Sequence, residues 1–464
     1  MCPRAHTPWM AYTSPWISQL RRVRPALALE GDTRASVTIV GGGIAGMATA
    51  YFALSRTDRE VLVVEAGKIG HGASGHNAGQ AVSYFERPFQ DIAAEFGLPL
   101  AAAAQREIIG AWDLLEGIFR EAGLRTPLVQ FTGYAGFTAL GQVISRLESM
   151  ALFREGGLEP EVTFVSRESG LLHHIPAPLR PFCSLRPRQE ILSLLETPDS
   201  RYIACAVSRK GCMNSALFSE ELAGYLLARY PDRFRIAEHT PVRELIPSPD
   251  GATLSTDHGR ITSDRVVLCT NGFTGIRLSD PAGRALPGAG QRVRGVVGYM
   301  AGYLDPVDRD PTAIRYYSAS TSDHTVPYYY LTRRHYEPGK GGEVLLCAGG
   351  PETDLPAGAG YEPHRTYIPG AREELQDFLG STYRPGIGSL HPRFLWHGLM
   401  GYTPGGIRLA GPDPRYRALL YNLGCNGVGI LPSVAGGLRI ARHLAGEHLE
   451  PSIFDPGRPR ETPP

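Results

Sequence analysis

Lysine is nearly absent from this chain of 464 residues, which has Lys68, Lys210 and Lys340 and no others. Arginine therefore supplies almost all of the 47 basic side chains, which balance 46 acidic ones to a formal charge of +1. A balanced charge offers neither the basic surface that nucleic acids require nor an attraction to anionic membranes. We expect no nucleic-acid partner.

The sequence also has no paired cysteine motif, no histidine cluster with the spacing of a metal site and no long apolar run. The seven cysteines form no C-x-x-C pair, which is typical of reduced thiols in a cytoplasmic protein. Because no histidine cluster has metal-ligand spacing, we expect no metal. No apolar run reaches the ~18 residues of a transmembrane helix. The arginines at 21, 22 and 24 precede Pro25 and acidic residues instead of an apolar stretch, so no signal peptide is expected.

A glycine turn organises what the sequence does contain. A β-branched run at residues 37–40 enters Gly41, Gly43 and Gly46, and small and apolar residues follow at helical spacing. In this G-x-G-x-x-G pattern the first glycine allows the tight turn, the second lets the backbone approach a pyrophosphate, and the third lets helix and strand pack closely. The helix N-terminus would then hold the diphosphate.

An acid ends the second strand of this unit. Glu65 follows Gly46 by 19 positions, close to the spacing of about 20 for a carboxylate that binds a ribose hydroxyl. Because an acid here disfavours a 2′-phosphate, FAD or NAD fits better than NADP. The structural alternative is a tight glycine turn with Glu65 facing solvent.

Periodicity predicts helices and strands in the rest of the chain. We expect an arm over residues 1–32 and a disordered tail after Pro451. The predicted helices cover 98–124, 214–230, 371–378 and 433–444. The predicted strands are a hairpin at 240–245 and 252–256, a buried strand at 264–268, an antiparallel sheet within 292–347, and a strand at 418–423.

The order of these motifs resembles the superfamily of glycine oxidase and D-amino-acid oxidase, which are FAD enzymes. The loop at residues 72–80, GASGHNAGQ, resembles the G-A-S-G-R-N-G-G-Q loop of the gamma-glutamylputrescine oxidase branch. Trp396-His397-Gly398, with Thr403-Pro404 and Gly411-Pro412, is similar to the family's W-x-G and T-P-D-G-x-P-x-x-G segments.

The resemblance implies an α/β fold, α+β overall, with a Rossmann-type FAD-binding domain built from separated segments and an antiparallel-sheet substrate domain above the flavin. The expected FAD-binding domain comprises 33–97, 205–275 and 395–448. The expected substrate domain comprises 98–204 and 276–394, and 449–464 form the tail.

The resemblance also implies which residues hold the cofactor. Val242 would lie near the adenine, and the turn from Gly424 to Gly429 would approach the pyrimidine end of the flavin. The expected cofactor-binding residues are Gly41, Gly43, Ile44, Ala45, Gly46, Glu65, Ala66, Ser74, Gly75, His76, Asn77, Ala78, Gly79, Gln80, Val242, Thr270, Asn271, Gly272, Gly424, Asn426, Gly427, Val428 and Gly429.

Three positions depart from the family pattern. Relatives that act on D-amino acids carry an arginine for the substrate carboxylate where this chain has Met400, and the T-P-D aspartate is Gly405. The cysteine that tethers the flavin in the sarcosine oxidase branch falls near Gly398, so no cysteinyl bond is expected. Simple D-amino acids should be poor substrates unless Arg333 or Arg393 replaces the missing arginine.

The resemblance implies an FAD-dependent oxidoreductase that oxidises a C–N bond of an amine or amino-acid derivative. A neutral amine would pass hydride to the flavin, the imine would hydrolyse, and oxygen or an electron carrier would reoxidise the cofactor. The expected substrate wall is Tyr328, Tyr330, Arg333 and Trp396, each of which fits core packing equally well. A hydroxy-acid dehydrogenase, a tRNA-modifying flavoprotein and a non-catalytic flavin-binding protein are the alternatives.

His76 has a second interpretation. Residues 76–79 reproduce the H-x-A-G of the dimethylglycine dehydrogenase branch, in which the histidine is bonded to the flavin 8α carbon. A neutral imidazole is the nucleophile that such a bond needs. Alternatively, His76 only hydrogen-bonds the flavin or its phosphates.

Overall fold

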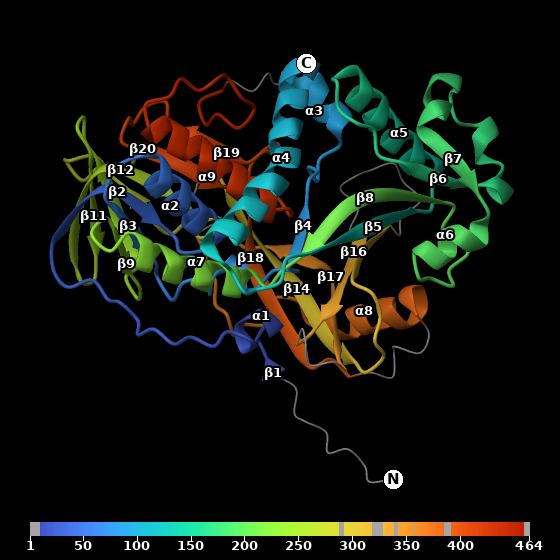
Figure 1. The fold of residues 1–464 in the computed structure, drawn as a ribbon, viewed down its shortest axis with the longest axis horizontal. Helices are drawn as coiled ribbons and strands as arrows, with labels where there is room; N and C mark the ends of the chain where they lie inside the picture. The colour runs from blue at the N-terminus through green and yellow to red at the C-terminus, as the bar shows by residue number, and fades with distance from the viewer. Residues whose placement is uncertain are drawn as a thin grey trace, which may run out of the picture.

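The computed structural model describes residues 10–286, 292–317, 328–337, 342–356, 358–384 and 391–458. Two mixed sheets form the frame of the molecule, and the expected α/β class, α+β overall, is confirmed. Figure 1 shows the smaller sheet with β2, β3 and β12 at the left and the larger sheet across the middle and right. None of the helices in these ranges is long and apolar enough to cross a membrane.

The smaller sheet carries the glycine turn. β2 pairs in parallel with β3 on one side and β12 on the other, and β3 is buried at every position, as expected for a parallel strand with both faces covered. β10 and β11 form the predicted antiparallel hairpin. In sheet order the strands are β13 (Arg277–Leu278), β10 (Val242–Pro247), β11 (Ala252–Thr256), β12 (Gly259–Leu268), β2 (Thr33–Val40), β3 (Val61–Val64) and β9 (Phe234–Ala237), with β20 (Leu419–Leu423) beside β12 and β19 (Leu409–Pro412) beside β20.

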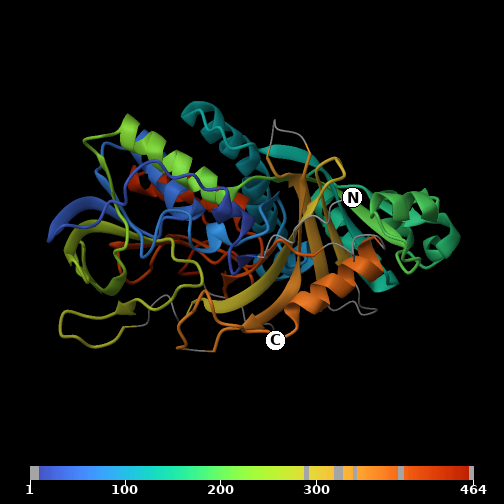
Figure 2. The same ribbon diagram turned by 90° about the horizontal axis from the view of Figure 1, so that it is seen from below.

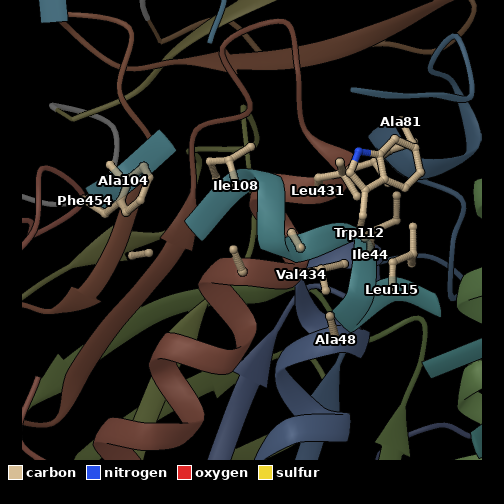
Figure 3. Packing of buried hydrophobic residues seen from close by; sticks show 14 of the residues in the cluster. Ile44, Ala48, Ala81, Ala104, Ile108, Trp112, Leu115, Leu431, Val434 and Phe454 are labelled. Carbon is tan, nitrogen blue, oxygen red and sulfur yellow. The ribbon is translucent and has the colours of Figure 1, made fainter. Parts of the chain in front are cut away.

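Four helices pack beside the smaller sheet: α2 (Ile44–Arg56), α4 (Leu98–Ala122), α7 (Ser215–Arg229) and α9 (Ile430–Leu444). A Cβ at Gly437 would lie 2.9 Å from the backbone nitrogen of Thr49, so α2 and α9 cross at close range. Figure 3 shows Trp112 and Leu115 of α4 beside Ile44 of α2 and Val434 of α9. The predicted helices at 98–124, 214–230 and 433–444 are confirmed.

The larger sheet is antiparallel in its centre and parallel at three pairs, β1–β18, β15–β5 and β6–β7. The strands predicted within 292–347 pair antiparallel with one another, as expected, and the whole sheet is mixed because of pairs that involve strands outside that range. Helix α8 (Ala371–Phe378), confirmed with its predicted bounds, covers one face of it (Figure 2). In sheet order the strands are β1 (Met10–Ala11), β18 (Phe394–Tyr402), β14 (Arg294–Asp305), β17 (Val344–Asp354), β16 (Tyr328–His335), β15 (Thr312–Tyr317), β5 (Val129–Phe137), β8 (Ala204–Cys212), β6 (Thr163–Ser166) and β7 (Cys183–Arg186), with β4 (Gln80–Val82) beside β8.

The sheets divide the chain differently from the expected domains, whose boundaries stay a prediction. β8 and β18 were expected in the FAD-binding segments, yet both belong to the larger sheet. Helix α4 was expected in the substrate domain, yet it packs on α9. The remaining described α-helices are α1 (Pro15–Ser18), α3 (Phe89–Phe96), α5 (Leu140–Glu155) and α6 (Arg188–Leu194).

The expectation of a disordered tail is wrong for residues 451–458. Phe454 is 3% exposed and lies beside Ala104 of α4 (Figure 3). Its carbonyl accepts a hydrogen bond from the Ala410 N–H at 2.9 Å, and Asp455 forms an ion pair with Arg439 at 2.7 Å. The proline- and glycine-rich composition of this segment suggested disorder, but the segment contains a short apolar stretch that packs against the core. The last predicted tail residues, 459–464, lie outside the described residues.

The N-terminal arm is fastened to the molecule by charge and by one tryptophan. Arg22 and Arg24 form ion pairs with Glu238, whose side chain is fully buried. The Ile69 N–H also donates to this carboxylate at 2.8 Å. Burial opposes ionisation, but these donors outweigh it and hold the pKa of Glu238 at about 2. Trp16 is buried and donates its indole N–H to the carbonyl of Asn77 at 2.5 Å.

We predict that Glu238→Gln lowers the free energy of unfolding by about 3 kcal/mol at neutral pH, because it removes the buried carboxylate that Arg22 and Arg24 share and leaves these half-buried guanidinium groups with Glu220 alone. The lowered pKa sets the pH range of the effect. The pKa of glutamate in an unfolded chain is about 4.3. The contribution of Glu238 to the free energy of unfolding is therefore complete above that pH and is lost as pH falls toward 2.

Thermal unfolding of both proteins from pH 7 to pH 2.5 checks this prediction. The Tm difference should be largest above pH 5 and shrink below it. Asp264→Asn is the control, because Asp264 pairs with Arg34 at the surface, where side-chain exposures are 35% and 70%. Equal effects of the two substitutions at neutral pH would contradict the prediction.

Candidate cofactor and substrate site

A cavity of about 900 Å³ is lined by residues of both sheets. From the smaller sheet come the glycine turn, the end of β3 and the start of β10. From the larger sheet come β14, β15, β16, β17 and β18. The loop from Gly72 to Gln80 lines it as well. The cavity therefore joins the sequence-predicted cofactor motifs to the predicted substrate wall.

The glycine turn is too tight for side chains. A Cβ at Gly46 would lie 1.8 Å from the Gly41 carbonyl oxygen, and one at Gly41 would lie 2.7 Å from the Cys269 carbonyl oxygen. Gly41 also has φ of +110°, a region that favours glycine. The free N-terminus of α2 follows directly, and the Ile44 N–H donates to Ser74 Oγ at 2.9 Å. Gly43, Ile44 and Ser74 all face the cavity.

Glu65 lies at the cavity edge where β3 ends. One carboxylate oxygen accepts from the Gly42 N–H at 2.7 Å, and the other accepts from the Gly67 N–H at 2.8 Å. Burial raises the pKa of Glu65, and these two hydrogen bonds oppose the rise. The carboxylate is held by the turn beside the cavity, which disfavours the alternative of a glutamate facing open solvent.

Most of the expected cofactor residues line the cavity, and four described ones lie behind it. Those that line it are Gly41, Gly43, Ile44, Ala45, Glu65, Ala66, Ser74, His76, Asn77, Ala78, Gly79, Gln80, Val242, Thr270, Asn271, Gly272, Gly427, Val428 and Gly429. Those behind it, Gly46, Gly75, Gly424 and Asn426, shape the backbone. The Asn426 side chain, for example, accepts from the Thr403 N–H at 2.8 Å and is 5% exposed.

Two separated turns are joined at the cavity wall. Asn271 follows the turn after β12 with a left-handed φ of +50°. Its side-chain oxygen accepts from the Cys425 N–H at 3.0 Å, and its amide donates to Cys425 Sγ at 3.4 Å. These bonds hold the turn from Gly424 to Gly429, which enters α9, against the end of β12.

His76 lies in the cavity wall beside Gly398. A Cβ at Gly398 would lie 2.9 Å from His76 Cβ, so the two motif positions occupy one end of the cavity. The His76 Nδ1 lies 3.0 Å from the Gly72 carbonyl oxygen, which can only accept, so Nδ1 carries the proton and Nε2 has the lone pair in the neutral ring. Burial lowers the pKa of His76 and favours that neutral form.

The predicted substrate wall is half right in its placement. Tyr328 and Tyr330 line the cavity. Arg333 does not, because its guanidinium binds Glu196 at 2.6 and 2.7 Å and Tyr383 at 2.8 Å on another side of the sheet. Trp396 shares its face of β18 with Gly398 and Met400, but it is fully buried beneath the cavity in a cluster with Trp16 and Met300 and does not line it. Alternation along β16 turns Arg333 away from Tyr328 and Tyr330.

Sequence reasoning missed the charged residues of the wall. Arg315, Glu86, Glu352 and Tyr402 line the cavity beside Tyr328 and Tyr330. A charged residue inside strand β15 is the one sequence signal that singles out Arg315, which is buried in the structure. Glu86 and Glu352 are 266 positions apart, so their meeting is a property of the fold.

These residues fit an FAD. The closely packed glycine turn offers free backbone N–H groups to a diphosphate, Glu65 offers a carboxylate to a ribose, and the cavity continues past the loop at 72–80 to the tyrosine wall. No group of three or more potential metal ligands occurs among the described residues.

Solved structures of flavin enzymes have the same fold. Glycine oxidase from Geobacillus kaustophilus is 20% identical, with a TM-score of 0.67 that covers 92% of this chain and 99% of that one. L-proline dehydrogenase from P. horikoshii is 16% identical, with the same TM-score over 92% and 98% of the two chains. At these identities the likeness establishes the fold.

Similarity to curated proteins is confined to short segments. Two relatives align over 153 and 89 residues, which is 28% and 21% of their own lengths. The shorter match, 33% identical, is to gamma-glutamylputrescine oxidoreductase of Escherichia coli (strain K12), and it covers 19% of this chain.

Family membership rests on a much longer match. The family described as FAD dependent oxidoreductase, DAO, matches residues 36–443, which include the glycine turn, both sheets and α9. That range agrees with the fold shared with glycine oxidase and with the residues that fit an FAD. The chain therefore belongs to the DAO family of FAD-dependent oxidoreductases.

Proposed function

We propose that this FAD-dependent enzyme oxidises a C–N bond of an amine or amino-acid derivative. The observation that carries the proposal is the cavity itself, in which the glycine turn and a wall of tyrosines and carboxylates belong to one continuous space. Carboxylates and tyrosine hydroxyls are groups that bind amines. Oxygen or an electron carrier would take the electrons from the enzyme.

The wall disfavours a simple α-amino acid as substrate. Met400 lines the cavity where relatives that act on D-amino acids have an arginine, and Arg333 is paired with Glu196. Arg393 does not line the cavity within the described part of the chain. Among the described arginines beside Tyr328 and Met400, Arg315 is paired with Glu86 and Arg294 with Asp354, so neither offers an unpaired guanidinium for the two-pronged contact that an α-carboxylate prefers.

The residues of this chain would orient the amine and exclude water. Burial raises the pKa of both Tyr328 and Tyr330, so their hydroxyls stay protonated and act as hydrogen-bond donors at physiological pH. FAD, when bound, supplies a two-electron acceptor for the hydride that leaves the carbon next to the nitrogen. The nitrogen lone pair forms the C=N bond, so the reacting amine has to be neutral, and water hydrolyses the imine.

We predict that the purified protein is yellow and that Gly43→Val loses the flavin. A Cβ at Gly43 would lie 2.6 Å from Ser74 Oγ, and the added methyl groups would project where the backbone has to approach the diphosphate. The absorbance ratio of flavin to protein measures the loss. Gly110→Ala is the control, because that helical glycine has open space around its Cβ position and should keep its flavin. A colourless wild-type protein that binds NAD alone would refute the cofactor.

The substrate class is tested by anaerobic bleaching of the flavin spectrum. We expect secondary amines, polyamine derivatives or amino acids that react away from the α-carbon to bleach it, and D-alanine to do so poorly, because Met400 cannot bind a carboxylate. A hydroxy-acid panel is the comparison. Efficient bleaching by D-alanine, or by hydroxy acids and no amine, would contradict the proposal.

His76 is compatible with two roles, covalent attachment of the flavin or hydrogen bonding to it. The unprotonated Nε2 and the neighbouring Gly398 support a position near the end of the flavin that other branches tether. Acid precipitation separates the roles. Yellow colour in the supernatant indicates a dissociable flavin held by hydrogen bonds. Colour in the pellet that His76→Ala abolishes indicates a histidyl bond.

A further inference from the structure

Two carboxylates, Glu86 and Glu352, face the same part of the cavity. Glu86 follows β4, and Glu352 lies on β17. A Cβ at Gly427 would lie 3.0 Å from Glu86 Cγ and 3.2 Å from the Tyr402 hydroxyl. The Tyr402 side chain also acts on the Glu352 carboxyl and lowers its pKa, so Tyr402 neighbours both acids.

Arg315 is the nearby cation, and its binding groups are already occupied. Its guanidinium lies between the rings of Tyr84 and Tyr328, with Cζ 4.6 and 4.4 Å from the ring centres. One terminal nitrogen donates to the Tyr317 hydroxyl at 2.9 Å, and the other donates to Tyr84 and to Glu86 Oε1 at 2.9 Å. Arg315 thus fixes Glu86, and both of its terminal nitrogens already donate to protein groups.

The second carboxylate has no cation of its own. Glu352 is exposed to the cavity and forms no ion pair within the described residues, since the nearby Arg294 is bound to Asp354. Burial and then the charge of Glu86 raise the pKa of Glu352. Arg294 and the buried Lys210 also lie near these acids. Neither forms an ion pair with Glu352 among the described residues, so the ammonium group of a ligand can take that place.

Aromatic rings complete the surroundings of the two acids. Tyr328 donates its hydroxyl to Glu86 Oε1 at 2.9 Å, and its ring lies 5.9 Å from that of Tyr330. Burial, and then the charges of Glu86 and Glu352, raise the pKa of Tyr330 and of Tyr402, and all four residues line the cavity. Tyrosine faces bind ammonium groups by cation–π attraction, which adds to the attraction of the carboxylates.

We infer that Glu86, Glu352 and the rings of Tyr328, Tyr330 and Tyr402 bind a second, non-reacting ammonium group of the substrate. The inference rests on the proposed amine oxidation and narrows its substrate class. Two carboxylates keep a bound nitrogen protonated, and a protonated nitrogen cannot form the C=N bond. The nitrogen held here is therefore not the one that reacts, and the substrate is a diamine or polyamine, free or substituted at its reacting end.

The test compares linear α,ω-diamines of three to six carbons with the monoamine of the same length, using the holoenzyme. Anaerobic flavin bleaching gives the half-saturating concentration, and the shift in Tm gives binding without turnover. For at least one length, we expect the diamine to half-saturate at a concentration lower by a factor of about 10 or more, the effect of one close charge pair.

Matched variants identify the groups responsible. Glu352→Gln should raise the half-saturating concentration of the diamine by a larger factor than that of the monoamine, so that the two values approach each other. Tyr402→Phe should do so in part, because it removes the hydroxyl beside Glu352 and keeps the ring. Glu374→Gln is the control, since Glu374 accepts from Tyr329 on the same strand as Tyr328 but does not line the cavity.

Each outcome decides the inference. Equal half-saturation by diamines and monoamines at every length overturns it, and so do equal effects of Glu352→Gln and Glu374→Gln. If no amine bleaches the flavin, the proposed reaction fails by itself. The Tm shift then tests the binding of the second ammonium group separately. A shift that only the diamine causes, and that Glu352→Gln removes, would still support that binding.

Discussion

The close approach of α2 to the end of β2 is the constraint on which the rest of the site depends. A Cβ at Gly46 would lie 1.8 Å from the Gly41 carbonyl oxygen, and a Cβ at Gly41 would lie 2.7 Å from the Cys269 carbonyl oxygen. The helix can pack this closely on the turn only because both residues lack side chains. That distance brings the free N–H groups of the helix to the cavity. It also places Gly42 within hydrogen-bond reach of Glu65 and Ile44 within reach of Ser74. A side chain at either glycine would move all of these groups together.

Buried arginine is the second organising element, and it follows from the scarcity of lysine. Arg315 lies between two tyrosine rings, Arg333 binds Glu196 through two nitrogens, and Arg22 and Arg24 share Glu238. A planar guanidinium with several donors can satisfy a carboxylate and a ring face at once, which an ammonium cannot. The ion pairs that fix the cavity wall and the N-terminal arm therefore also set the orientation of the groups they join.

The sequence predicted those parts of the molecule that are encoded locally. The glycine turn, Glu65, the loop at 72–80 and helix α8 could be identified because their function or periodicity lies within a few residues. The polar end of the cavity could not, because Glu86, Arg315 and Glu352 meet only when β15, β16 and β17 pair. Arg333 does not line the cavity because strand alternation does not tell which face of a sheet meets the cofactor. Trp396 lies on the face that does, but Trp16 of the N-terminal arm packs against it in the core.

The arm that ends in Arg22 and Arg24 gives the molecule an order of assembly. Residues 10–24 are synthesised before every group that holds them, because Glu238 and β18 come more than two hundred residues later. Trp16 supports the loop at 72–80 from behind by bonding to Asn77. Because Trp16 is itself buried against Phe394 and Trp396 of β18, the support of this loop is complete only when the last strand of the larger sheet is in place.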